Sequence, residues 1–326
     1  MASISTAPPR AVGRSRLQHF VVNNALVLVL YAFLTVAMVG LSIYSPTFRS
    51  AGNLWTLAKQ AVIPGIIGIA QTMIILSGGI DLSVASLVTF SSLVCAGFID
   101  NKEERMVSVT LLMLLVGILV GVFNGLVVTR GHVPPFITTL GTALLLQGSG
   151  LAYTTVPKGG IPTSMGNFLY YGQIGPVPNP VIFLVVIFVA MWFVLSRTGF
   201  GRAIYAVGGN SEVARRSGIK VNQVRLMAFV LGSFLVAIAG LIATARMGIG
   251  DPQAGMGMEL DSITAVVIGG TSLFGGRGNL FGTMAGVIIL TLINNVMVIL
   301  NVSTWYQQLI KGFVVLLVVA IYKQRA

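Results

Sequence analysis

One stretch of the chain, residues 76–87, places a carboxylate and a hydroxyl beside a glycine pair, between two apolar runs. Asp81 is the one carboxylate set deep between apolar runs, and an unpaired charge at membrane depth costs on the order of 2.5–3.5 kcal/mol. Such a residue is typical of a substrate pathway or gate. It could instead cap the next helix, with Ser83, for roughly 0.5–2 kcal/mol. We favour the cap, because Gly78 and Gly79 suit the end of the preceding helix.

Other polar side chains within apolar runs are candidates for the same pathway. Asn124, Asn294 and Asn295 could bind a substrate hydroxyl, or could bond across helices for roughly 0.6 kcal/mol each. The stretch 268–279 repeats the glycine-rich pattern of the first stretch and adds two hydroxyls. The pathway candidates are Gln71, Asp81, Ser83, Asn124, Thr271, Ser272, Asn294 and Asn295.

The residue patterns of common enzymes are missing from the sequence. There is no G-x-x-x-x-G-K-[ST] motif, and residues 275–278 lack the lysine and hydroxyl that hold phosphate and magnesium. There is no HExxH or CxxC motif, and the two histidines, His19 and His132, lie near the ends of apolar runs. The single cysteine, Cys95, excludes an intrachain disulfide. We therefore expect no catalytic residues, no metal site and no cofactor in this chain.

The composition indicates a polytopic membrane protein. The 326 residues are 55% hydrophobic and 9% charged, with a mean hydropathy of +0.92. A soluble domain carries roughly 25% charged residues. The net charge of +12 would suggest nucleic acid in a soluble chain. Here the basic residues cluster in short loops between apolar runs, where they act as topology signals, so we expect no nucleic-acid partner.

We expect an all-α fold of about ten transmembrane helices. The first apolar run is too long for a cleavable signal and serves as a membrane anchor. Residues 45–60 are predicted to be interfacial, and the Gly- and Pro-rich residues 155–180 to form an external loop. The run 262–276 is short for a crossing and could be a half-helix. The predicted spans are 20–48, 60–80, 82–99, 106–129, 131–157, 181–196, 226–245, 262–276, 280–300 and 304–322.

The basic residues predict the orientation of these spans. With the N-terminus inside, Lys and Arg are about twice as numerous in inner segments as in outer ones, as the positive-inside rule requires. Both termini are then cytoplasmic. The predicted parts are a tail at 1–19, a transmembrane domain at 20–322 and a tail at 323–326.

An internal repeat relates two parts of the chain, about 60–157 and 262–322. The segment Ile75 to Leu82 echoes Ile268 to Leu273, and a second pair of similar segments follows, each with asparagine. Two broken helices in matching positions of two halves indicate a transport pathway.

The basic segment 197–225 contains a complete short helix. Asn210 can cap its start and Gly218 can stop it, with an acidic residue near the start and two arginines near the end. The arginines could hold this helix near anionic lipid. A partner that orders it is the better explanation, because so short a helix has little stability alone. The residues expected to contact that partner are Asn210, Glu212, Val213, Ala214, Arg215, Arg216 and Gly218.

Four motifs in this order resemble the membrane permease subunit of ribose-type ABC sugar importers, and the resemblance extends over about residues 20–322. Ala85 departs from the family, which commonly has glycine there. The motifs are Gly78–Ser83; Pro134–Gly141; Tyr205–Asn210 with Ala214 and Ser217–Ile219; and Glu259–Asp261 through Gly269–Leu273.

The resemblance implies a multi-pass protein of the bacterial inner membrane that imports a ribose-like monosaccharide. It implies a cytoplasmic ATPase that binds ATP and magnesium and docks at residues 212–218, a periplasmic sugar-binding protein, and a second permease copy or a paralogue. Three rivals remain. A secondary transporter or facilitator would need an ion-coupling carboxylate, which only Asp81 offers. A membrane enzyme would need buried ionisable groups, and this chain is short of them. A related permease could carry nucleosides or branched-chain amino acids.

Overall fold

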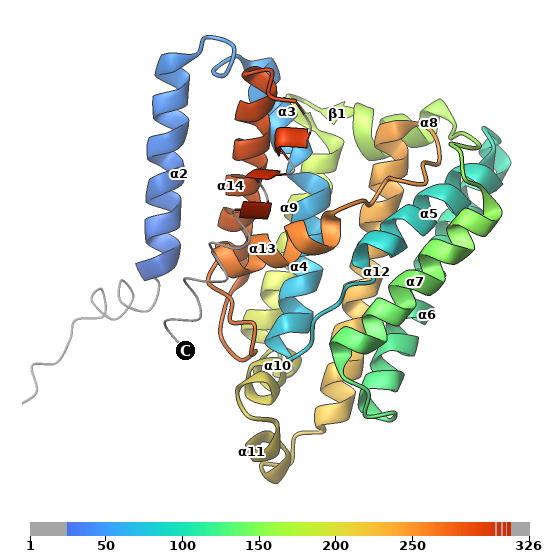
Figure 1. Cartoon of the computed structure of the whole chain (residues 1–326), viewed down its shortest axis with the longest axis vertical. Helices are drawn as coiled ribbons and strands as arrows, with labels where there is room; N and C mark the ends of the chain where they lie inside the picture. Colours follow the sequence, from blue (N-terminus) through green and yellow to red (C-terminus); the bar gives the residue numbers. More distant parts are fainter. Residues whose placement is uncertain (1–24, 304, 308, 311, 314–326) are drawn as a thin grey trace, which may run out of the picture.

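The computed structural model describes residues 25–303, 305–307, 309–310 and 312–313, and within them nearly all of the regular secondary structure is helical, which confirms the all-α prediction (Figure 1). The N-terminal tail, most of the predicted span 304–322 and the C-terminal tail lie outside these residues. The helices are α2 (Ala25–Tyr44), α3 (Ala51–Gln60), α4 (Val62–Leu76), α5 (Val84–Ile99), α6 (Glu103–Thr129), α7 (Pro135–Tyr153), α8 (Thr163–Gly166), the π-helix η1 (Asn167–Tyr171), α9 (Asn179–Arg197), α10 (Gly199–Gly209), α11 (Ser211–Arg216), α12 (Val221–Met247), α13 (Met258–Ile268) and α14 (Leu280–Ile299).

Six stretches of the described chain are long and apolar enough to cross a membrane. Helix α5 has only 16 residues, fewer than a full crossing needs. Helix α13 has 11 residues, a length in keeping with the half-helix alternative given for the run 262–276. The crossing count of ten therefore stays a prediction. The six stretches are α2, Ala51–Leu76, α6, α9, α12 and α14.

Two segments differ from the sequence prediction. Residues 51–60 form helix α3 and continue, after the single residue Ala61, into α4, so they belong to a 26-residue apolar stretch. Ser50 starts this helix by accepting a hydrogen bond from the Asn53 N–H at 3.2 Å, a cap that the interfacial interpretation overlooked. Within residues 155–180 the chain also has regular structure: α8, η1 and a hairpin of β1 (Gln173–Ile174) and β2 (Val177–Pro178).

Helix α4 lies at the centre of the fold. Every residue from Val62 to Leu76 except Pro64 is buried, which is expected of a helix that is apolar on all sides. Helices α9, α10, α12, α13 and α14 all contact it. By contrast, only 6% of α2 is buried, and α2 stands at the edge of the molecule (Figure 1).

Small residues allow α6 to approach α12 closely. Gly117, Gly121 and Gly125 lie four residues apart on one face of α6. A Cβ atom added at any of them would lie 2.5–2.6 Å from an atom of α12. This spacing is the small-xxx-small pattern of tightly packed membrane helices. Helices α6 and α12 therefore pack closely against each other.

Two helix breaks organise the interior. The first, residues 77–83, separates α4 from α5, and the second, residues 269–279, separates α13 from α14. Helices α10 and α11 lie at one end of the molecule, whereas the β1–β2 hairpin and α8 lie at the other (Figure 1). Both breaks were predicted from their glycines, which confirms that part of the sequence analysis.

Candidate functional site

Asp81, Ser83 and Asn124 form a buried polar network with Thr142. One Asp81 oxygen accepts hydrogen bonds from the Ser83 backbone N–H at 2.7 Å and from the Ser83 hydroxyl at 2.5 Å. The Asn124 amide on α6 donates to the Ser83 hydroxyl oxygen at 3.1 Å. The Thr142 hydroxyl on α7 donates to the Asn124 carbonyl oxygen at 2.6 Å. All four side chains are buried, so the network fixes the first break to α6 and α7.

Asp81 does not cap α5, contrary to the interpretation that we favoured. The N-cap residue of α5 is Ser83, and its side chain makes no capping hydrogen bond. Asp81 bonds instead to the residue two positions on, the Asx-turn arrangement by which aspartate closes a local turn. The Asp81 residue is only 1% exposed, so its carboxyl group is buried. Its Oδ2 atom has no hydrogen-bond partner in the described part of the chain.

A second threonine of α7 holds the backbone of the first break. The Thr139 hydroxyl oxygen accepts a hydrogen bond from the Leu82 N–H at 3.0 Å and lies 3.2 Å from the Ile80 carbonyl oxygen. Pro135 begins α7, as expected of proline in a first helical turn. Thr139 therefore contacts the first break directly, whereas Thr142, one turn later, is connected to it through Asn124.

The second break is built from backbone turns. The Ser272 N–H donates to the Arg277 carbonyl at 2.9 Å, and the Gly275 N–H donates to the Ser272 carbonyl at 3.0 Å. Gly270, Gly275, Gly276 and Gly278 all have positive φ, a conformation that other residues rarely adopt. Thr271 is buried, and its hydroxyl has no partner in the described part of the chain. This break therefore lacks a side-chain network like that of Asp81.

The two breaks meet each other at the end of α10. The Gly276 N–H donates a hydrogen bond to the Leu76 carbonyl at 3.1 Å. Gly208 packs so closely here that an added Cβ atom would clash with the Leu76 carbonyl oxygen and with the Gly276 nitrogen. One turn earlier, the Tyr205 hydroxyl donates to the Gly278 carbonyl at 2.9 Å. Helix α10 therefore contacts both breaks directly.

Helix α11 follows α10 immediately and has both predicted caps. The Asn210 side-chain oxygen accepts hydrogen bonds from the Glu212 and Val213 N–H groups, each at 3.0 Å. Gly218 has φ +84°, and the Ile219 N–H returns to a carbonyl of α11, as in a Schellman ending. This short helix is thus confirmed in its extent and in its caps.

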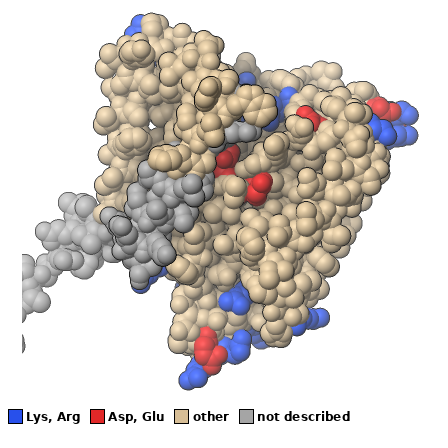
Figure 2. All heavy atoms as spheres, in the orientation of Figure 1, with Lys and Arg blue, Asp and Glu red and all other residues tan. Residues whose placement is uncertain are grey.

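The outer surface of α11 differs from the prediction. Val213 is 59% exposed, whereas Ala214 is 4% exposed and belongs to the main hydrophobic core. The expectation that Ala214 contacts the partner is therefore wrong, because other residues of this chain already cover it. Glu212 lies 3.1 Å from Arg216 and 3.9 Å from Arg215, which confirms those ion pairs. Lys and Arg side chains gather at this end of the molecule (Figure 2).

The other pathway candidates do not join the Asp81 network within the described residues. Gln71 is buried in α4, and neither the nitrogen nor the oxygen of its amide has a hydrogen-bond partner in the described part of the chain. Asn295 is buried and exchanges two amide hydrogen bonds with Asn53 of α3, at 3.0 and 3.3 Å. Asn294 lines a cavity instead. Sequence reasoning missed Asn53, whose position near the start of α3 gave no signal of this pairing.

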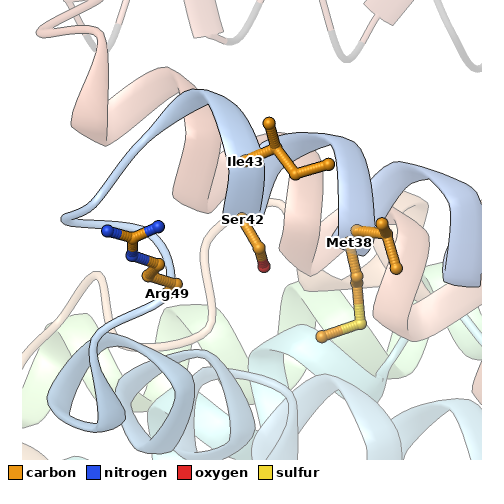
Figure 3. Close-up of a pocket in the computed structure, with 5 residues that line it drawn as sticks. Met38, Ser42, Ile43 and Arg49 are labelled. Atoms are coloured by element: carbon orange, nitrogen blue, oxygen red, sulfur yellow. The ribbon is translucent and has the colours of Figure 1, made fainter.

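A cavity of about 460 Å³ lies beside the end of α2 (Figure 3). Met38, Val39, Ser42 and Ile43 of α2 line it, together with Arg49 of the following turn. Because the lining comes from one helix and its turn, polar groups from several helices do not converge there. A smaller cavity, of about 370 Å³, is lined by both polar and apolar residues, most of them from α3, α4, α12, α13 and α14.

Comparison with known proteins identifies the family. Residues 53–319 match the family described as branched-chain amino acid transport system / permease component. The ribose import permease protein RbsC of Bacillus subtilis is 40% identical over 295 residues, which cover 90% of this chain and 91% of the relative. This chain is an ABC-importer permease of that family.

Two further relatives carry other substrate names. The D-allose transport system permease protein AlsC of Escherichia coli is 35% identical, over 84% of each chain. The fructose import permease protein FrcC of Rhizobium meliloti is 33% identical, over 94% of this chain and 87% of the relative. No solved structure matches. The permease is a non-catalytic, multi-pass membrane subunit, as the resemblance implied.

Proposed function

We propose that this permease moves a monosaccharide, such as ribose or a similar sugar, inward across the bacterial inner membrane. The observation that carries the proposal is the agreement among relatives: each of the three spans at least 84% of this chain and is named for a monosaccharide. The family description also names branched-chain amino acids. The sugar-named relatives favour a sugar over that alternative.

The energy source is a separate cytoplasmic ATPase that binds ATP and magnesium. Its docking surface is α11, where exposed Val213 stands among the charged side chains of Glu212, Arg215 and Arg216. A partner ATPase supplies the packing that so short a helix lacks. A periplasmic sugar-binding protein delivers the substrate at the opposite end, and a second permease, identical or paralogous, completes the transporter.

The pathway passes the two helix breaks. Polar residues available to it are Asp81, Ser83 and Asn124 at the first break and Thr271 and Ser272 at the second. Contact of both breaks with α10 supports this, because α10 leads directly into α11. Movement at the docking surface then reaches both breaks through a few glycine contacts.

The predicted topology has ten crossings, cytoplasmic termini and an internal repeat. Support comes from the six apolar stretches and from the position of α10–α11 at the end opposite the β1–β2 hairpin (Figure 1). The basic segment 197–225 is cytoplasmic and the hairpin faces the periplasm in this arrangement.

Uptake of radiolabelled D-ribose into proteoliposomes tests the proposal. The vesicles contain the permease, its ATPase and the binding protein, with ATP either present at the ATPase side or omitted. We expect uptake that requires ATP and that continues when an ionophore dissipates ion gradients. Uptake without ATP that stops with the ionophore would establish a secondary transporter instead. L-leucine, tested in parallel with its own binding protein, is expected to remain outside.

A further inference from the structure

The cavity of about 370 Å³ lies in the half of the molecule away from α11. Arg246, near the end of α12, lines it, and its backbone carbonyl accepts a hydrogen bond from Tyr171 of η1 at 2.7 Å. Gln60, the last residue of α3, also lines the cavity. The Nζ atom of the neighbouring Lys59 lies 5.7 Å from the centre of the Tyr170 ring, and Tyr170 is also in η1. The cavity is therefore next to the loop region that the proposed topology places in the periplasm.

The lining combines neutral polar, oppositely charged and apolar groups. The amides of Gln60 and Asn294 can accept and donate hydrogen bonds, and the Thr291 hydroxyl, which donates to the Val287 carbonyl at 2.8 Å, can accept one. The apolar surface of the cavity comes from Pro64, Met256, Met258, Ala265, Val287, Leu290 and Val298. Arg246 and Asp261 bring one charge of each sign. A lining with balanced charge suits a neutral ligand that has many hydroxyls. It does not suit a strongly anionic ligand such as a sugar phosphate, which would need an excess of positive charge.

Asn294 provides a second observation that points to a ligand. Its Oδ1 atom is buried and has no hydrogen-bond partner in the described chain. A buried carbonyl left without a partner is unfavourable, because it has lost its hydrogen bonds to water and gained none in return. The adjacent Asn295 has its amide paired with Asn53, so of these two neighbouring asparagines it is the one lining the cavity whose side-chain oxygen has no partner in the described chain.

We propose that this cavity is a monosaccharide-binding site in the outer half of the pathway, with Asn294 and Gln60 as direct contacts to sugar hydroxyls. The inference rests on the proposed function. Ligand pockets range from about 300 to 1,000 Å³, and a volume near the lower limit suits a single sugar ring. A sugar hydroxyl donates to the Asn294 carbonyl, and the sugar's apolar face lies toward Met258.

Protection of an introduced cysteine from a thiol reagent tests this site. The one native cysteine, Cys95, is fully buried, so it does not obscure the reaction. Asn294→Cys is assembled into the complete transporter in proteoliposomes and treated with a small methanethiosulfonate reagent, with and without saturating D-ribose, D-allose or D-fructose. Leu300→Cys is the matched control, because Leu300 follows α14, is 58% exposed and does not line the cavity.

We expect the transported sugar to slow the reaction at Asn294→Cys at least 10-fold and to leave Leu300→Cys unchanged. Gln60→Cys, on another helix, should show the same protection, and it replaces Asn294→Cys if that variant does not assemble. ATP-driven sugar uptake without protection at either cavity position would overturn the site alone. Protection by L-leucine rather than by any sugar would overturn the sugar assignment and the proposed function with it.

Discussion

The two helix breaks are held in different ways. At the first break, Asp81 and Ser83 bond to each other, and Asn124, Thr139 and Thr142 connect them to two neighbouring helices. The second break makes its hydrogen bonds mainly through the backbone and has four glycines with positive φ. Phe274, in its middle, is 78% exposed. The first break is thus anchored by side chains to helices, whereas the second depends on close backbone contacts.

This difference indicates which break moves during transport. A network of buried hydrogen bonds that joins three segments resists rearrangement, because breaking it leaves further polar groups without partners. At the second break the contacts are between glycine backbones, so no polar side chain loses its partner when the two breaks move apart. We therefore expect the second break to move against the first, with Gly208 of α10 at the point where both can be displaced by α11.

The largest effect is expected from Gly208→Ala. The added Cβ atom would clash with backbone atoms of both breaks, which cannot rotate away as a side chain could. We predict that ATP-driven sugar uptake falls more than 10-fold, measured in proteoliposomes. Gly209→Ala is the matched control, because nothing lies within 4 Å of a Cβ atom there. Equal activity of the two variants would show that the close packing at Gly208 is not required.

A smaller effect, on stability, is expected from Asn124→Ala. The substitution removes two hydrogen bonds at the first break and leaves the Ser83 and Thr142 hydroxyls with one partner fewer. Each lost hydrogen bond contributes about 0.5–1.5 kcal/mol, and the two hydroxyls keep their bonds to Asp81 and to the Thr138 carbonyl, so thermal unfolding in detergent should begin at a lower temperature. Ser149→Ala, an exposed position on α7, should leave the unfolding temperature unchanged. An unchanged temperature for Asn124→Ala would remove the proposed contrast between the breaks.

Tyr205→Phe should have the smallest effect. It removes only the hydrogen bond from α10 to the Gly278 carbonyl at the second break, for about 0.5–1.5 kcal/mol. We predict that sugar uptake decreases a few-fold while ATP hydrolysis continues, measured side by side in the same vesicles. The matched change Tyr44→Phe, at a site 81% exposed on α2, should alter neither rate. A parallel loss of uptake and hydrolysis would mean that Tyr205 supports assembly rather than coupling.

The features that sequence predicted best are local. The α11 helix was predicted with both caps because Asn210 and Gly218 act on backbone groups within a few residues of themselves. The breaks were predicted for the same reason, since glycine determines the backbone at its own position. The pattern Gly117-xxx-Gly121-xxx-Gly125 could have predicted close packing of α6, but not that α12 is its partner.

Features that depend on distant partners were missed or assigned wrongly. Asp81 was interpreted as a cap because nothing near it in sequence shows that Asn124 of α6 supports its partner Ser83. The prediction that Ala214 faces the partner was wrong, because the sequence of a six-residue helix is too short to distinguish its buried face from its exposed face. Helix lengths were overestimated at α5 and α13, where apolar residues continue into the breaks.

Copurification of the ATPase with variants at Val213 tests the central claim, that α11 is the surface on which the ATPase docks. Val213 is the exposed apolar residue of α11, so Val213→Asp places a charge at that surface, whereas Val213→Ala keeps it apolar. Ala214→Asp is unsuitable, because it would disturb the core of the permease itself. We predict that the permease with Val213→Asp inserts into the membrane but loses the ATPase on purification, and that Val213→Ala retains it. Full retention of the ATPase by Val213→Asp would contradict the account.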